Sequence, residues 1–360
     1  MQYVEISLPA HSSAAVLGAR GGAWLAWGGD LSAPDLYVQR VGALEAQRLP
    51  ISGAPTDIRL LALAERRMAL LWLERSAGSP ALQVATLEPD GNLRRAPFEI
   101  GAAQRYIALP TPTGGVLALT IQEGALVINQ LDRLGRPYGR VRAAESAHMA
   151  AATLDGRDRL HLLWLAPGDG ELWQLLYLSI QLALLDESAP RLPAPTLLAV
   201  LRLAEGEYVE SLSAAADAEH LYAVWNVVRV WHGGAAGRLD GIVLQQEAPL
   251  RSRQLDLSAL PADLREVSLP FADDGQGSAV TLVGRSEERW IVFGALTARG
   301  VFRVQQFEAA TADQTLSGGV AASLSANNAL HLAWLVRDEQ GRAKLRYAAF
   351  PRPQPALAPS

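Results

Sequence analysis

The chain contains no cysteine, which excludes disulfide bonds and thiolate metal sites and leaves the redox compartment undetermined. No apolar run reaches the roughly 20 residues that a membrane-spanning helix requires. The longest, residues 172–185, is interrupted by Gln174, Ser179 and Gln181. The first residues lack the basic segment of a signal peptide. We therefore predict neither a signal peptide nor a transmembrane segment in this chain, no direct membrane insertion, and no particular localisation.

Charge of either sign is also scarce, and this excludes other classes. The formal net charge is −5 over 360 residues, and Lys344 is the only lysine. The arginines are scattered rather than clustered, so the basic footprint of a nucleic-acid-binding surface is missing, and nucleic acid is not expected as a partner. Apolar residues make up 49% of the chain, which indicates a globular protein with a large core.

One short apolar strand recurs throughout the sequence. The segment Leu160–Leu165 (LHLLWL) returns as Leu330–Leu335 (LHLAWL), and looser copies occur in residues 23–27, 68–73 and 221–226. Both alternating sets of side chains are apolar, so such a strand has to be covered on its two faces. This favours the blade of a β-propeller, packed between neighbours, over a sandwich with one wet face.

The tryptophan of this strand serves as a ruler for counting blades. Equivalent positions follow at intervals of 41 to 68 residues, with a threonine and a phenylalanine where tryptophan is missing: Trp27, Trp72, Thr120, Trp164, Trp225, Phe293 and Trp334. A blade takes about 40 to 50 residues. We therefore predict an all-β, seven-bladed propeller with insertions in the fifth unit, and six or eight blades as alternatives.

The ends of the chain suggest how the ring closes. The seventh unit has only three strands, while residues 2–8 form a strand that belongs to no unit. Pairing of this N-terminal strand with the last blade would close the ring and cover two strand edges. The predicted organisation is a single propeller domain over residues 1–350 and a proline-rich tail or linker over residues 351–360.

An apolar strand with histidine or tryptophan, a polar turn, and a tyrosine-containing strand such as Leu345–Ala348 resemble the repeats of bacterial sialidase-like propellers. The resemblance covers most of the chain, but the Asp-box of those repeats (Ser-x-Asp-x-Gly-x-Thr-Trp) is absent. It implies a glycan-binding or glycan-hydrolysing alternative and transfers no catalytic residue.

Histidine and acidic residues are the candidates for catalysis and metal binding. None of the six histidines forms a pair with metal-ligand spacing, and His161 and His331 occupy the same place in the repeat, so packing between blades is the favoured interpretation. The acidic segments 155–158 and 272–275 offer too few carboxylates for calcium and are interpreted as turns. No catalytic residue, metal site or cofactor is predicted.

Two insertions stand out. Residues 227–237 of the fifth unit join a second to a third strand and include Arg229, Trp231 and His232 between glycines. We interpret them either as a contact loop or as a long hairpin that covers a blade edge. Residues 188–207 include three prolines followed by the apolar run 197–201, which we interpret mainly as an outer strand and alternatively as a partner-docking segment.

The main functional hypothesis is a non-enzymatic module that binds or scaffolds an unknown protein or glycan. The alternative is the sialidase-like glycan-binding or glycan-hydrolysing propeller. Under that alternative, loop residues are predicted to point into one funnel: Asp30, Arg75, Asp169, Arg229, Trp231 and Arg337. These six residues and His232 are the candidate ligand- or partner-binding residues.

Overall fold

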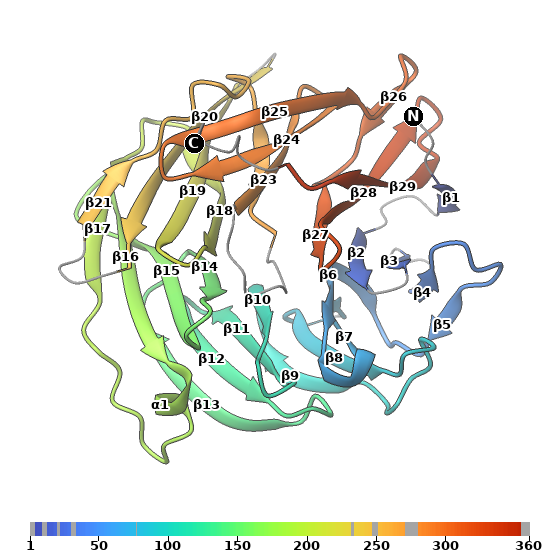
Figure 1. Ribbon diagram of the computed structural model, residues 1–360, viewed down its shortest axis with the longest axis horizontal. Coiled ribbons are helices and arrows are strands. Elements are labelled where there is room, and N and C mark those ends of the chain that lie inside the picture. Colours follow the sequence, from blue (N-terminus) through green and yellow to red (C-terminus); the bar gives the residue numbers. More distant parts are fainter. Residues whose placement is uncertain are drawn as a thin grey trace, which may run out of the picture. The chain divides into compact units, whose positions relative to one another are not determined.

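The computed structural model describes residues 4–8, 13–19, 22–29, 34–76, 78–231, 234–246, 251–270 and 280–353. Its strands form seven antiparallel sheets, six of four strands and one of five (Figure 1). In the six four-stranded sheets, strands that follow one another in the chain pair with each other. These sheets are the seven blades of a β-propeller. The predicted fold class and blade count are confirmed, and the alternatives of six or eight blades are wrong.

The chain divides into two compact units, one of Met1–Glu145 with Ala312–Pro351 and the other of Ser146–Thr311 with Arg352–Ser360. The first unit holds blades one, two, three and seven, and the second holds blades four, five and six. The proposed boundary between a domain of residues 1–350 and a tail of residues 351–360 stays a prediction.

In the first unit, blades one to three follow the order of the chain, whereas in blade seven both β26 and β27 pair with β28 and the N-terminal strand joins at the other edge. Blade one comprises β2 (Ser13–Ala19), β3 (Gly22–Gly28), β4 (Leu36–Arg40) and β5 (Gln47–Leu49). Blade two comprises β6 (Ala54–Ala62), β7 (Met68–Arg75), β8 (Ala81–Leu87) and β9 (Phe98–Ala102), with the 3-10 helix η1 (Ala64–Arg66) between its first two strands. Blade three comprises β10 (Arg105–Pro110), β11 (Val116–Gln122), β12 (Ala125–Leu131) and β13 (Pro137–Ala144). Blade seven comprises β26 (Gln314–Leu316), β27 (Ala321–Ser325), β28 (Ala329–Asp338), β29 (Ala343–Pro351) and β1 (Val4–Leu8).

The second unit has the same blade pattern. Blade four comprises β14 (Met149–Leu154), β15 (Arg159–Pro167), β16 (Leu172–Gln181) and β17 (Thr196–Arg202), with the short helix α1 (Leu182–Leu185) after β16. Blade five comprises β18 (Glu207–Ala216), β19 (His220–Trp231), β20 (Gly234–Gln245) and β21 (Arg251–Gln254). Blade six comprises β22 (Arg265–Ser268), β23 (Val280–Ser286), β24 (Trp290–Thr297) and β25 (Gly300–Glu308). The run 197–201 lies in the fourth strand of blade four, as predicted.

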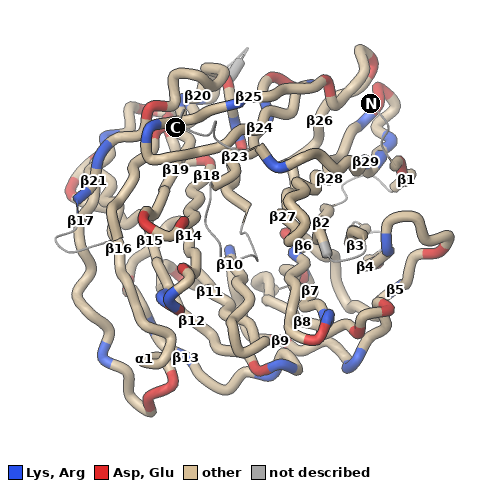
Figure 2. Tube along the Cα trace, viewed as in Figure 1, with Lys and Arg blue, Asp and Glu red and all other residues tan. Residues whose placement is uncertain are grey.

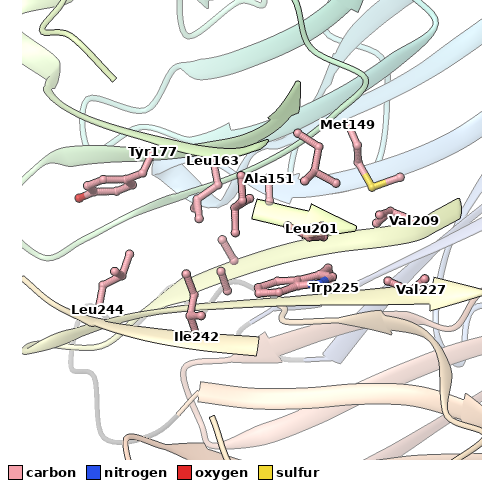
Figure 3. Close-up of a cluster of buried hydrophobic side chains, with 14 of the residues drawn as sticks. Met149, Ala151, Leu163, Tyr177, Leu201, Val209, Trp225, Val227, Ile242 and Leu244 are labelled. Atoms are coloured by element: carbon pink, nitrogen blue, oxygen red, sulfur yellow. The ribbon is translucent and has the colours of Figure 1, made fainter. Parts of the chain in front are cut away.

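The repeated strand is the second strand of six blades, and burial explains its composition. In β15, every side chain from Leu160 to Ala166 is buried. Its odd-numbered residues Leu163 and Leu165 face blade five, where they pack in one cluster with Trp225 of β19 (Figure 3). Each central strand therefore needs apolar residues on both faces, because water reaches neither.

The residue assigned to the tryptophan position does not lie in the second strand of blade six. Phe293 lies in β24, the third strand, whereas the second strand is β23, which carries no aromatic residue. The buried run from Ile291 to Leu296 has the same composition as a second strand, so hydrophobicity alone could not separate the two.

The predicted closure by the N-terminal strand is confirmed. Strand β1 pairs antiparallel with β29, with Val4 opposite Tyr347 and Leu8 opposite Ala343. Glu5 of β1 accepts hydrogen bonds from Lys344 Nζ at 2.7 Å and Arg346 Nε at 3.0 Å. The last blade thus gains an outer strand from the other end of the chain.

Charged side chains are dispersed along the chain, and those of the two signs alternate (Figure 2). Within the described residues, no helix has the length and apolar character that crossing a bilayer would need.

Candidate functional site

Five of the predicted site residues fall within the described part of the chain, and they lie at or just beyond the ends of β7, β15, β19 and β28. Arg75 is the last residue of β7 and is exposed, and Arg337 is half-buried near the end of β28. Asp169 is exposed in the turn from β15 to β16. Arg229 is exposed on β19, and Trp231 ends that strand opposite Gly234.

Asp30 and His232 lie outside the described residues. Arg75 and Arg337 belong to the first unit, and Asp169, Arg229 and Trp231 belong to the second. Neither Asp169 nor Arg229 has a side-chain hydrogen bond or ion pair to any residue that the structure describes. Convergence of the six funnel residues therefore stays a prediction.

The insertion of the fifth unit is a long hairpin. Strands β19 and β20 have 12 residues each, and they pair without interruption from His220–Gln245 to Trp231–Gly234. The neighbouring strand β18 pairs with β19 only as far as Glu207, opposite Arg229. Val230 and Trp231 thus extend beyond the blade as a two-stranded projection.

The two faces of the hairpin, where it leaves the blade, differ in chemistry. On one face, Arg238 bridges Glu207 at 3.4 Å and Asp240 at 3.1 Å. On the other face lie Tyr208, 44% exposed, and Val230, 56% exposed, which are diagonal neighbours because Tyr208 is opposite Val228. The hairpin therefore combines an ionic face with an exposed apolar face.

A charged cluster lies at the base of the hairpin, between blades five and six. The Glu210 carboxylate accepts hydrogen bonds from Asn226 Nδ2 at 3.0 Å, Arg265 Nη2 at 2.6 Å and the backbone N–H of Glu266 at 3.3 Å. The Glu266 carboxylate in turn accepts one from Arg285 Nη2 at 2.6 Å. Two glutamates and two arginines therefore lie across the first strand of blade five and the first two strands of blade six.

Two irregularities in the strands position Glu210 and Glu266. Glu210 is the extra residue of a bulge in β18, because Val209 pairs with Val227 and Ser211 with Asn226. A second irregularity in β22 holds Glu266 at a φ of 51°. Bulges redirect side chains away from the regular alternation of a strand, and they occur often beside functional sites.

The ion pair of Arg265 with Glu210 joins blade six to blade five, and the ion pair of Arg285 with Glu266 lies within blade six. The hydrogen bond from Arg265 to Glu210, together with their charge attraction, raises the pKa of Arg265 above its already high value. The sequence reasoning missed this cluster, although a glutamate just before Ser-Leu or Val-Ser-Leu in both inner strands was a usable signal.

A second buried polar network occupies the repeat position of His161 in blade four. His161 hydrogen-bonds through Nδ1 to Tyr177 Oη at 2.9 Å and through Nε2 to Asp155 Oδ2 at 3.1 Å. Asp155 also accepts the backbone N–H groups of Arg157 and Arg159 at 2.8 and 3.0 Å, and it pairs with the Arg159 guanidinium. Burial alone would raise the pKa of Asp155, but these hydrogen bonds hold it well below its usual range.

The equivalent position of blade seven holds a neutral network. His331 hydrogen-bonds through Nδ1 to Tyr347 Oη at 2.7 Å and through Nε2 to Ser325 Oγ at 3.0 Å. Burial lowers the pKa of His331 and raises the pKa of Tyr347. His161 and His331 are 1% and 6% exposed, so both rings are packed in the interior, as predicted.

The described residues contain no group of three histidine or acidic side chains arranged to hold a metal ion. Of the two acidic segments, residues 155–158 form a hydrogen-bonded turn, as predicted, and residues 272–275 lie outside the described part.

Comparisons with known proteins identify the fold of the chain but no family. No protein-family model matches the chain, and no curated protein matches its sequence significantly. Solved structures of similar fold confirm the resemblance to a β-propeller, while the narrower resemblance to sialidase-like repeats stays a prediction.

Solved structures of similar fold have diverse activities. The polysaccharide lyase Uly1 is similar with a TM-score of 0.61 and 8% identity, over 92% of this chain and 89% of the lyase. A virginiamycin B lyase from Staphylococcus aureus is similar with a TM-score of 0.52 and 9% identity, over 96% of this chain and 100% of the lyase. Drosophila plexin A, solved in complex with semaphorin 1b, has a TM-score of 0.51 and 8% identity, over 96% of this chain and 86% of the plexin chain. At such identities the similarity shows the fold alone, because one fold carries many functions.

Proposed function

We propose that this chain is a non-enzymatic binding module that contacts a protein partner through the hairpin β19–β20. The observation that carries the proposal is the projection of this hairpin beyond β18, with the exposed side chains of Arg229, Val230 and Tyr208. Aromatic and arginine side chains dominate the binding energy of many protein interfaces.

The base of the hairpin supports this role because it is held in place. Asn226, completely buried, donates to Glu210, which is bound in turn to Arg265 of blade six. A Cβ atom at Gly237 would lie 3.3 Å from Asn226 Oδ1 and 3.9 Å from Arg265 Cγ, so the second hairpin strand rests directly on the cluster. A preorganised contact element loses little conformational entropy when a partner binds.

Site-specific photo-crosslinking in the host cell tests the proposal. A photoreactive phenylalanine analogue replaces Val230, and the control replaces Tyr138, which is 61% exposed on the outer strand of blade three. We expect one discrete crosslinked protein from position 230 and none from position 138. The substitution Tyr208→Ala should reduce the product at least about fivefold, as expected for loss of an interface anchor of roughly 1 kcal/mol.

Two results would overturn the proposal. One is equal crosslinking, or none, at the two positions. The other is specific binding of the purified chain on a glycan array that Tyr208→Ala and Arg229→Ala abolish, which would establish the glycan-binding alternative instead.

A further inference from the structure

We propose that the outer edge of blade four, strand β17, is a homodimer contact at which a second copy of this chain pairs with it antiparallel. The inference is independent of the hairpin and of its partner. It starts from the comparison of outermost strands, whose unpaired backbone groups attract other strands unless they are protected.

Six of the seven blades protect their outermost strand by charge or by shortness. Strand β5 has three residues. The others carry exposed charged side chains within the strand: Glu99 in β9, Arg140 and Arg142 in β13, Arg251 and Arg253 in β21, Arg303 and Glu308 in β25, and Glu5 in β1.

Strand β17 carries its one charge, the exposed Arg202, at its last residue. No charged residue occurs from Thr196 to Leu201, and the large apolar side chains exposed in that stretch are those of Leu197 at 51% and Val200 at 53%. Leu201 packs inward in the cluster shared with blade five, and β17 pairs only with β16 among the described strands. The strand therefore presents an apolar surface and a free backbone edge together.

Charge and chain geometry favour a second copy in antiparallel orientation. Arg202, the only charge in the strand, lies at one end, so antiparallel copies keep the two arginines at opposite ends, whereas parallel copies would put them side by side. Leu197 and Val200 of one copy would then lie against the same pair of the other, which is the self-complementarity that a two-fold interface requires. Pro195 has no backbone N–H and ends the pairing edge at Thr196.

The contact is expected to be weak. Leu198 is a bulged residue, because Leu175 pairs with Ala199 and Leu176 with Leu197, so the regular stretch is short. A small interface of this kind corresponds to a Kd of roughly 1–100 µM.

Sedimentation velocity on the full chain tests the dimer. The mass should rise with concentration from 38.5 kDa toward twice that value. Val200→Lys should raise the Kd at least about tenfold, because it places lysines of both copies at the contact. The matched control Tyr138→Lys, at a similarly exposed residue of β13, should leave the Kd unchanged.

The absence of cysteine provides a second measurement that depends on proximity rather than on affinity. Under mild oxidation, Val200→Cys should form a disulfide-linked dimer much faster than Tyr138→Cys. The proposal is overturned if the wild-type chain remains monomeric or forms open-ended oligomers, if Val200→Lys associates as the wild type does, or if the two cysteine variants crosslink at equal rates.

Discussion

Blades four and seven bury a histidine at the same place of the same strand, yet they satisfy it differently. In each blade the ring stacks on a tyrosine sixteen residues later, with centroids 6.0 Å apart, and its Nε2 faces a turn residue six positions earlier. That turn residue is Asp155 in blade four and Ser325 in blade seven. A buried histidine at this position therefore needs a hydrogen-bond partner for each of its two ring nitrogens, and neither partner has to be charged.

The two networks also reach the next blade by different means. In blade four, Arg159 Nη2 donates to Gln246 Oε1 of blade five at 2.7 Å, and Gln246 Nε2 donates to the backbone oxygen of Asp217 at 3.0 Å. In blade seven, the neighbour is Gly18 of blade one, where a Cβ atom would lie 2.3 Å from His331 Cδ2. The first junction is joined by side-chain hydrogen bonds. The second combines close packing at His331 with a hydrogen bond from the Gly18 N–H to Ser323 Oγ at 3.0 Å.

The largest expected difference follows from removing the turn residue. Asp155→Ala should lower the free energy of unfolding by about 3–5 kcal/mol, because it leaves the Arg159 guanidinium without its buried carboxylate and frees two backbone N–H groups. Ser325→Ala should cost about 1 kcal/mol, the usual worth of a neutral hydrogen bond. Urea unfolding followed by tryptophan fluorescence measures both. Equal losses would show that the charge of Asp155 adds nothing to the network.

The packed junction is tested by filling the space over His331. Gly18→Ala should cost about 2–3 kcal/mol, because His331 is held by hydrogen bonds on both ring nitrogens and cannot move aside. The matched background is His331→Ala, in which the added methyl group finds room. The same urea experiment should then show a much smaller effect of Gly18→Ala, whereas an unchanged loss would place the strain elsewhere.

The smallest effect is in the dependence of stability on pH. Burial lowers the pKa of His331, so the unfolded chain binds this proton more readily, and stability is lost as the pH falls through about 6.5 toward the pKa in the folded state. The pKa of Asp155 is lowered as well, so its contribution is complete above about pH 4 and is lost only below that value.

Urea unfolding between pH 5.5 and 7.5 should therefore show a shallower slope for His331→Gln than for the wild type, by at most about 1.4 kcal/mol per pH unit. Asp155→Asn should leave this range unaffected and flatten the slope below pH 4. A slope that changes only with the Asp155 variant in the neutral range would contradict the assignment.

The architecture was predictable from the sequence because every blade has to cover an apolar second strand on both faces. This requirement explains why the segment Leu160–Leu165 recurs as Leu330–Leu335, and the recurrence reveals the repeat of the blades. The prediction failed at Phe293, where the third strand of blade six is as apolar as a second strand and the tryptophan that separates them is missing. The tryptophan locates the second strand only in those blades that contain it.

The polar interior was much less predictable. The partners Asp155, His161 and Tyr177 share spacings of six and sixteen residues with their blade-seven counterparts, a signal that becomes meaningful only once strand pairing is known. Glu210 and Arg265 are 55 residues apart on separate blades and meet through bulged backbone, which no strand periodicity encodes. The sequence pattern therefore predicts the propeller fold better than it predicts the buried polar networks and the charged cluster.

The pairing of β1 with β29 has a consequence for the order of folding. Glu5 and Lys344 are 339 positions apart, so this contact closes a loop that includes nearly the whole chain, and such contacts form slowly. During synthesis β1 leaves the ribosome before β29, so β1 waits without its partner while the intervening blades are made. A chaperone or a transient strand that shields residues 4–8 in that interval would determine the yield of folded protein without changing its final stability.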